Sequence, residues 1–257
     1  MGRDGAAPAF SDDDRRARLA EVADRIRPTT LAREQRLPVL PALEPLVPGL
    51  RRGSTLSVDG PAATSLALAV AAGPSQDGAW VAAVGFPSLG LLAAAELGVA
   101  LERLVLVADP GRDGAGDGDG GDGAVWPAVV AALVDAFEVV LVHAGERVRA
   151  ADGRRLVART RERGAVLVQV GGTRSTRAAW PEGADVALTV VDATWEGLGE
   201  GHGHLRARRV TVESGGRRDA ARARRCELWL PSADGVVEPV LPAPVPLRPR
   251  RAAQEPA

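Results

Sequence analysis

Between residues 54 and 170, short and mostly apolar runs alternate with longer stretches in which apolar positions follow a helical period. The runs predict five strands, at Ser54–Asp59, Trp80–Val84, Leu104–Val107, Val139–His143 and Ala165–Val170. The stretches between them predict helices, over Ala62–Ala72, Ser88–Leu97, Pro127–Ala136 and Arg154–Arg163. Near-continuous apolar strands are buried on both sides, so the alternation predicts an α/β fold: a mostly parallel twisted sheet with helices on both faces.

After Gly172 the helical pattern stops, and a different organisation is expected. Val186–Val191, Val210–Glu213 and Cys226–Leu230 predict strands joined by Gly- and Arg-rich turns, which indicates a C-terminal antiparallel extension from about residue 185. We therefore divide the chain into an N-terminal amphipathic helical arm (1–30), a core with this extension (31–232) and a Pro/Arg-rich tail expected to be disordered (233–257).

Composition fits a globular protein, since 46% of the 257 residues are hydrophobic and 25% are charged. The net charge of −1 gives the whole molecule no electrostatic attraction for nucleic acid. Residues 1–6 contain no apolar leader, and no apolar run approaches the length of a membrane span. These features predict a cytoplasmic protein that does not contact membranes.

All 32 basic residues are arginine, because the sequence contains no lysine. Schiff-base chemistry and lysine-assisted phosphoryl transfer both need a side-chain amine and are excluded. Aromatic residues make up only 3% of the chain, which disfavours a base-stacking platform for single-stranded nucleic acid.

Candidate metal ligands are few. The acidic stretch Asp109–Gly123 does not fit the register of an EF-hand calcium loop, and we interpret it as a flexible surface loop. His202 and His204 imply no third ligand, so a turn is favoured over a metal site. Cys226 alternates with polar residues in a predicted strand, as a small core residue does. No metal, cofactor or catalytic residue is predicted.

The segment from Gly53 to Leu68 has the organisation of a phosphate-binding loop: a strand, a turn of small residues, then a helix. In the pattern GxxxxGK[ST], Gly60 matches the first glycine. Ser65, Leu66 and Ala67 stand where the second glycine, the lysine and the Mg²⁺-binding Ser/Thr belong. Without the lysine and the Mg²⁺ ligand, phosphoryl transfer loses its electrostatic stabilisation, so the chain is predicted not to be an enzyme.

At this point the chain resembles the RecA-like P-loop fold, through the approach to this loop (Leu43–Gly60) and the segment after it (Trp80–Val107). More narrowly, Gly85–Val99 and Trp195–Gly199 resemble ImuA-type proteins, RecA-like and SulA-related accessory proteins of actinobacterial mutagenesis cassettes. The similarity covers about residues 31–232, and it is the order of the motifs that carries it.

The resemblance implies where further RecA positions fall. The glutamate that activates water falls near Phe86, and the Walker B aspartate falls on His143, so both are lost. Gln169 is a candidate survivor of the glutamine that senses the γ-phosphate. The lysine-rich DNA loops of RecA have no clear counterpart, and the loop Gly171–Arg177 is a candidate replacement.

Arginines cluster repeatedly, mostly in the extension and the tail. We single out six of them as candidate DNA or partner contacts, against the alternative of ordinary solvated surface: Arg206, Arg208, Arg209, Arg222, Arg224 and Arg225.

The resemblance implies a non-catalytic adaptor in damage-induced, error-prone translesion DNA synthesis. It would bind the Y-family polymerase homologue ImuB and help to recruit an error-prone C-family DNA polymerase, with direct DNA binding secondary. Two alternatives stay open: a divergent ATPase in which Arg51 or Arg52 replaces the lysine, and a cell-division inhibitor resembling SulA. A plain single-strand binder is disfavoured by the shortage of aromatic residues.

Overall fold

The computed structural model describes residues 36–109, 122–143, 149–171, 183–198, 202–217 and 222–240. The predicted arm 1–30, most of the acidic loop, the loop after Gly171 and the tail beyond residue 240 lie outside the described residues. None of the helices in the described ranges is long and apolar enough to cross a membrane.

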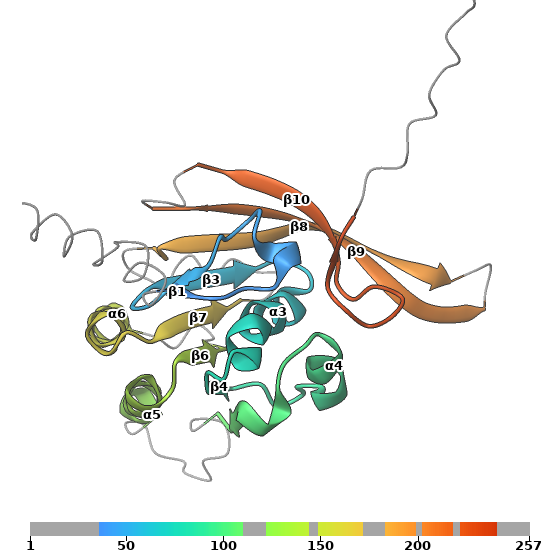
Figure 1. The fold of residues 1–257 in the computed structure, drawn as a ribbon. Coiled ribbons are helices and arrows are strands. Elements are labelled where there is room, and N and C mark those ends of the chain that lie inside the picture. Colours follow the sequence, from blue (N-terminus) through green and yellow to red (C-terminus); the bar gives the residue numbers. More distant parts are fainter. Residues whose placement is uncertain are drawn as a thin grey trace, which may run out of the picture.

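A nine-stranded sheet organises the structure, with the strand order β11-β10-β9-β8-β3-β7-β6-β4-β5 (Figure 1). Its strands are β3 (Thr55–Asp59), β4 (Val81–Val84), β5 (Leu104–Val107), β6 (Val139–Val142), β7 (Val166–Val170), β8 (Val186–Leu198), β9 (Gly203–Gly216), β10 (Arg224–Trp229) and β11 (Glu238–Pro239). The strands from β8 to β5 pair in parallel, and β9, β10 and β11 continue the sheet antiparallel. The predicted α/β fold class, including its antiparallel extension, is confirmed.

Helices cover the parallel part of the sheet on both faces (Figure 1). They are α3 (Ala63–Gln76), α4 (Leu91–Glu96), α5 (Asp122–Ala136) and α6 (Ala150–Arg163), with a short helix η2 (Leu101–Arg103) before β5. Successive residues of a strand point to opposite faces, so Ala83 and Leu141 pack in the α3 cluster while Ala82 and Val140 pack against α5 and α6. All four residues of β4 and of β6 are therefore buried.

The chain before β3 forms a small separate sheet of β1 (Arg36–Leu37) and β2 (Leu50–Arg51), with the short helix η1 (Pro41–Leu43) between them. Its apolar side chains join the cluster around α3, among them Leu43, Leu46 and Leu50. This segment thereby covers the amino end of β3.

The antiparallel extension is longer than the sequence pattern predicts. β8 continues from Val191 to Leu198, and β9 begins at Gly203. Past a bulge at residues 190–192, most side chains of β8 are exposed. Residues 192–198 and 202–209, which we call the distal hairpin, project from the sheet at the right of Figure 1. At the other end of the extension, β11 pairs with β10, so the sheet continues past residue 232.

Candidate functional site

The connection from β3 to α3 is much shorter than a phosphate loop. Gly60 has a φ of +95°, Ala62 is left-handed with a φ of 68°, and α3 begins at Ala63. In a phosphate loop the strand and the helix are separated by the GxxxxGK[ST] motif. Here only residues 60–62 separate the end of β3 from the start of α3. The backbone N–H groups that would wrap a phosphate are already part of the helix.

The packing of the turn against β8 explains why residue 60 is a glycine. A Cβ at this position would lie 2.2 Å from the carbonyl oxygen of Val190 on β8, so only glycine allows the turn to approach that strand. Leu66 and Ala67 belong to α3, and both are fully buried in the core. The positions that match a lysine and a Mg²⁺ ligand therefore point into the protein interior.

Ser65 is bound by an arginine of the extension. The Nη2 of Arg208 donates a hydrogen bond to Ser65 Oγ at 2.7 Å, and its Nε donates to the Leu230 carbonyl, also at 2.7 Å. The guanidinium lies 4.8 Å from the ring centroid of Trp195, within cation–π range. Burial lowers the pKa of Arg208 from its ordinary value, although an arginine stays protonated in proteins. A cation of the protein itself thus sits beside the first turn of α3.

The two positions carried over from the water-activating and Walker B residues do come together. His143 follows β6, and its backbone N–H donates to the Val84 carbonyl at 3.0 Å. Its ring meets Phe86 edge to face, with the ring centroids 5.7 Å apart. With Thr64 and residues 85–89 they line a cavity of about 240 Å³, and none of these described residues is a carboxylate. Groups that could hold Mg²⁺ or activate water are not among the described lining residues.

Gln169 is not among the residues that line this cavity. It is 1% exposed on β7, paired in register with Ser57 and Val142. Neither its side-chain nitrogen nor its oxygen has a hydrogen-bond partner among the described residues. Its register partner Val142 directly precedes His143, so the two positions lie near each other, although Gln169 is buried and does not line the cavity.

The six candidate arginines do not form one patch. Arg208 and Arg224 point toward the α3 side of the sheet, where Arg224 Nη1 donates to the Leu46 carbonyl at 3.5 Å. Arg225 follows in the same strand and so faces the other way, where it pairs with Glu213 at 3.2 Å. The other three are exposed, two on the distal hairpin and one before β10: Arg206, Arg209 and Arg222.

The other predicted candidates are also distributed. His202 and His204 are both exposed, and no group of three or more His, Cys, Asp or Glu side chains in the described ranges could hold a metal ion. Cys226 is half-buried in β10, and burial raises the pKa of its thiol to about 11. Arg51 and Arg52 precede β3, whereas Gly60 follows it, and a five-residue strand spans about 17 Å. Neither arginine is therefore placed to replace a lysine at that turn.

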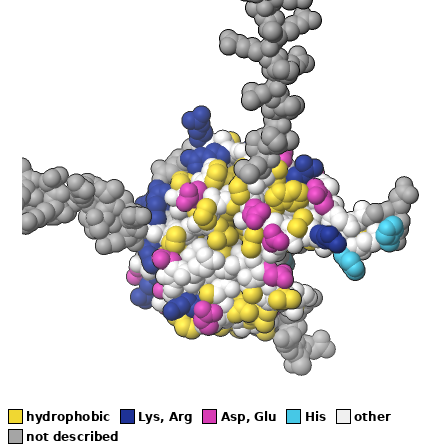
Figure 2. Space-filling model, turned by 45° about the vertical axis from the view of Figure 1, so that its right-hand side comes forward, with side chains coloured by type: hydrophobic (Ala, Val, Ile, Leu, Met, Phe, Trp, Pro, Cys, Tyr) yellow, Lys and Arg dark blue, Asp and Glu magenta, His cyan; other side chains and the backbone are white. Residues whose placement is uncertain are grey.

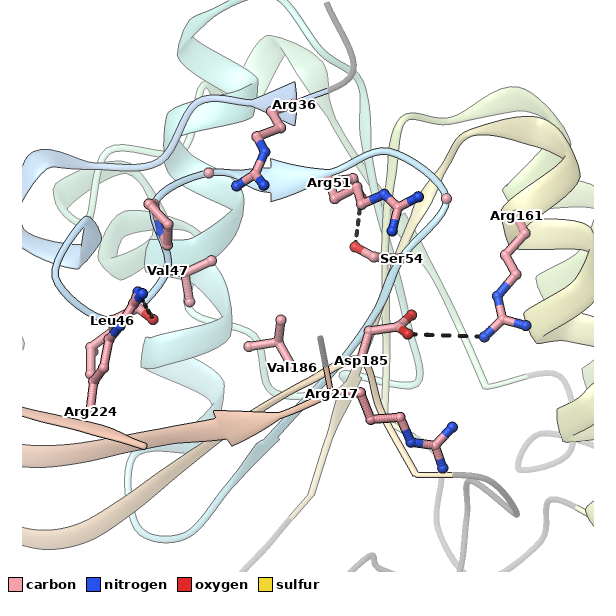
Figure 3. A pocket seen from close by; sticks show the side chains of 13 residues that line it. Arg36, Leu46, Val47, Arg51, Ser54, Arg161, Asp185, Val186, Arg217 and Arg224 are labelled. Carbon is pink, nitrogen blue, oxygen red and sulfur yellow. Dashed lines mark hydrogen bonds and ion pairs between the residues drawn. The ribbon is translucent and has the colours of Figure 1, made fainter. Parts of the chain in front are cut away.

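Sequence reasoning missed a second and larger cavity, at the amino end of β3 (Figure 3). It has a volume of about 340 Å³ and lies between the β1–β2 segment, α6 and the start of β8. Five arginines line it: Arg36, Arg51, Arg161, Arg217 and Arg224. They come from five separate segments, so local sequence gave no signal that they meet.

Comparison with solved structures finds a similar fold. The crystal structure of the RadB recombinase superimposes with a TM-score of 0.52 at 15% sequence identity, over 78% of this chain and 97% of that one. At this identity the likeness establishes the fold alone, and that fold is RecA-like.

Sequence comparisons identify nearer relatives. The uncharacterized protein Rv3395c of Mycobacterium tuberculosis is 40% identical over 112 residues, which are 43% of this chain and 48% of the relative. The chain therefore matches about half the length of that curated relative. The family model of the MT3502 N-terminal domain matches residues 45–182, more than half of the chain and all of the segment from β3 to β7. The chain thus belongs to the MT3502 N-terminal domain family, and it carries that domain on a RecA-like fold.

Proposed function

We propose that this protein is a non-catalytic RecA-like adaptor in error-prone translesion DNA synthesis, which binds a Y-family polymerase homologue of the ImuB type. The assignment to translesion synthesis rests on the resemblance to ImuA-type proteins. Those proteins are found in actinobacteria, and the relative Rv3395c also comes from an actinobacterium, Mycobacterium tuberculosis. A C-family polymerase would join the complex through this contact.

The observation that supports the adaptor role is the absence of a phosphate loop between β3 and α3. The RecA-like sheet is kept, yet α3 begins at Ala63 and Arg208 is bonded to Ser65. A fold that is retained without its phosphate loop fits a protein that acts by binding other proteins rather than by hydrolysing ATP.

The distal hairpin offers a contact surface for such a partner. Three large apolar side chains on it are exposed: Trp195 at 41%, Leu198 at 62% and Leu205 at 51%. Exposed apolar and aromatic side chains grouped on one element are typical of protein interfaces. The arginines around them, Arg206 and Arg209, would form a polar rim suited to an acidic partner surface.

The experiment is a pull-down of the Y-family homologue with the full chain and with the double variant Leu198→Asp/Leu205→Asp. The variant should lose the partner because two charges are placed in the apolar contact. Leu92→Asp is the matched control, since Leu92 is 74% exposed on α4 and distant in sequence from the hairpin. It should bind as the wild type does.

A genetic readout completes the test. Deletion of the gene should abolish damage-induced mutagenesis, and the hairpin variant should fail to restore it. If the wild type retains no lesion-bypass polymerase component and the deletion leaves induced mutagenesis unchanged, the proposal is wrong. Filamentation on overexpression, through blocked assembly of the division protein FtsZ, would instead favour the inhibitor alternative.

A further inference from the structure

We propose that the arginine-lined cavity at the amino end of β3 binds a small phosphorylated molecule of the nucleotide class. This site lies at the sheet edge opposite to the one that RecA-like folds use for nucleotides, and it is independent of the adaptor role proposed above. Strand direction explains why its lining residues meet. β3 and β8 begin at this edge, while the antiparallel β9 ends here and β10 begins here again.

Positive charge dominates the cavity. Among the described lining residues, five arginines face one carboxylate, that of Asp185. Figure 3 shows them on different sides, with Arg36 and Arg51 above, Arg161 to the right and Arg217 below. Figure 2 shows that arginine side chains also gather along one edge of the surface, at left in that view.

Asp185 offsets only one of these charges, and its carboxylate also has a structural task. Its Oδ2 accepts hydrogen bonds from the backbone N–H and the hydroxyl of Thr55, at 3.1 and 3.2 Å. Its Oδ1 lies 3.9 Å from Nη2 of Arg161, at the limit of an ion pair. These contacts fix the start of β8 against the start of β3. Five arginines and one carboxylate leave an excess of four positive charges among the described lining residues.

The backbone places like charges together here. β1 and β2 pair Arg36 directly opposite Arg51. Directly opposite residues of a strand pair put their side chains on the same face, and both arginines line the cavity. Gly53 tightens the same turn, since a Cβ there would lie 3.2 Å from the backbone of Arg161. The turn and α6 therefore hold Arg51 and Arg161 on neighbouring walls.

The ligand class follows from guanidinium chemistry and from cavity size. Arginine binds phosphate through paired, charge-assisted hydrogen bonds. Leu46, Val47, Pro48 and Val186 supply an apolar wall for the body of the ligand. A volume of about 340 Å³ lies in the range of small-molecule sites. None of the described lining residues is aromatic, so this part of the cavity offers no stacking platform of the kind that a nucleic acid strand would use.

The test is calorimetric titration of the full chain with ADP, with inorganic pyrophosphate and with a short oligothymidine, each in EDTA. Binding without Mg²⁺ is expected, because the one carboxylate among the described lining residues is engaged by Thr55. Arg51→Gln/Arg217→Gln should weaken ADP and pyrophosphate at least tenfold, since both side chains are exposed and line the cavity. Arg206→Gln/Arg209→Gln removes the same charge from the distal hairpin and should change affinity less than twofold.

Three results would overturn the proposal: no heat with ADP or pyrophosphate at millimolar concentration, equal weakening by both double variants, or binding of oligothymidine alone. Hydrogen exchange of the wild type provides a readout that needs no variant. ADP should protect residues 46–54 and leave residues 60–66 unchanged, and protection at residues 60–66 instead would refute the location. The cavity variant should still bind the polymerase homologue, so failure here is distinguishable from failure of the adaptor role.

Discussion

Gly60→Ala tests whether the β3–α3 turn is held against β8 as described. Gly60 has a φ of +95°, and a Cβ there would lie 2.2 Å from the Val190 carbonyl oxygen. The left-handed backbone costs an L-residue about 1–2 kcal/mol. Displacing a packed backbone costs about 1–3 kcal/mol more, while the stiffer unfolded chain returns about 0.5–1 kcal/mol. We expect the free energy of unfolding to fall by about 2–4 kcal/mol.

Urea denaturation followed by circular dichroism measures this loss. Gly215→Ala is the matched control, because a Cβ at Gly215 would meet no atom within 4 Å and its φ is not positive. Its free energy of unfolding should stay within about 0.5 kcal/mol of the wild type. If Gly60→Ala is as stable as Gly215→Ala, the close approach of the turn to β8 is incorrect, and with it our account of the missing loop.

The other predictions concern residues beside this turn and in the extension. Leu66→Lys restores the lysine of the motif but places an unpaired charge at a fully buried site. The free energy of unfolding should fall by about 3–5 kcal/mol, and calorimetry should show no ATP binding. Ser65→Ala removes the acceptor of Arg208, and urea denaturation should show a loss of about 1.5–3 kcal/mol; a loss below about 0.5 kcal/mol would contradict that bond. Because burial raises the pKa of Cys226 from 9.0 to about 11, its thiol should stay neutral through pH 9 and react with a disulfide reagent about a hundredfold more slowly in the folded protein than in urea. That protection should fade as pH rises toward 11, and equal rates at pH 8 would contradict it.

The parallel core could be predicted because its strands are buried on both faces. β5 occupies Leu104–Val107 as expected, and β4, β6 and β7 differ from prediction by one residue at one end. The ends of the helices were predicted less accurately than the ends of these strands. α3 continues past Pro74 to Gln76, although a proline normally ends a helix, because buried packing on the sheet outweighs one lost hydrogen bond.

The distal hairpin could not be predicted, since beyond residue 191 its residues are mostly exposed and carry no alternation of apolar and polar positions. Two strands can support each other by backbone hydrogen bonds alone, and these leave no side-chain pattern.

The site shows the same division. The sequence predicted the loss of the motif at Leu66 and Ala67. It could not predict the three-residue turn or the hydrogen bond from Arg208 to Ser65. Ser65 and Arg208 lie 143 positions apart, and only the long β9 brings them together. The arginine cavity takes Arg51, Arg217 and Arg224 from separate clusters, so its charge is set by topology rather than by local composition.

The position of β3 in the sheet has a consequence for how the chain folds. Its two neighbours, β7 and β8, begin at Val166 and Val186, more than a hundred residues later in the sequence. During synthesis β3 therefore has no described partner strand until most of the core has left the ribosome, and such late, non-local pairing folds slowly. A chain that stops before β7 would expose both edges of β3 to other chains. β3, which lies between the other parallel strands and β8, thus waits longer for its first partner than any other described strand of the sheet.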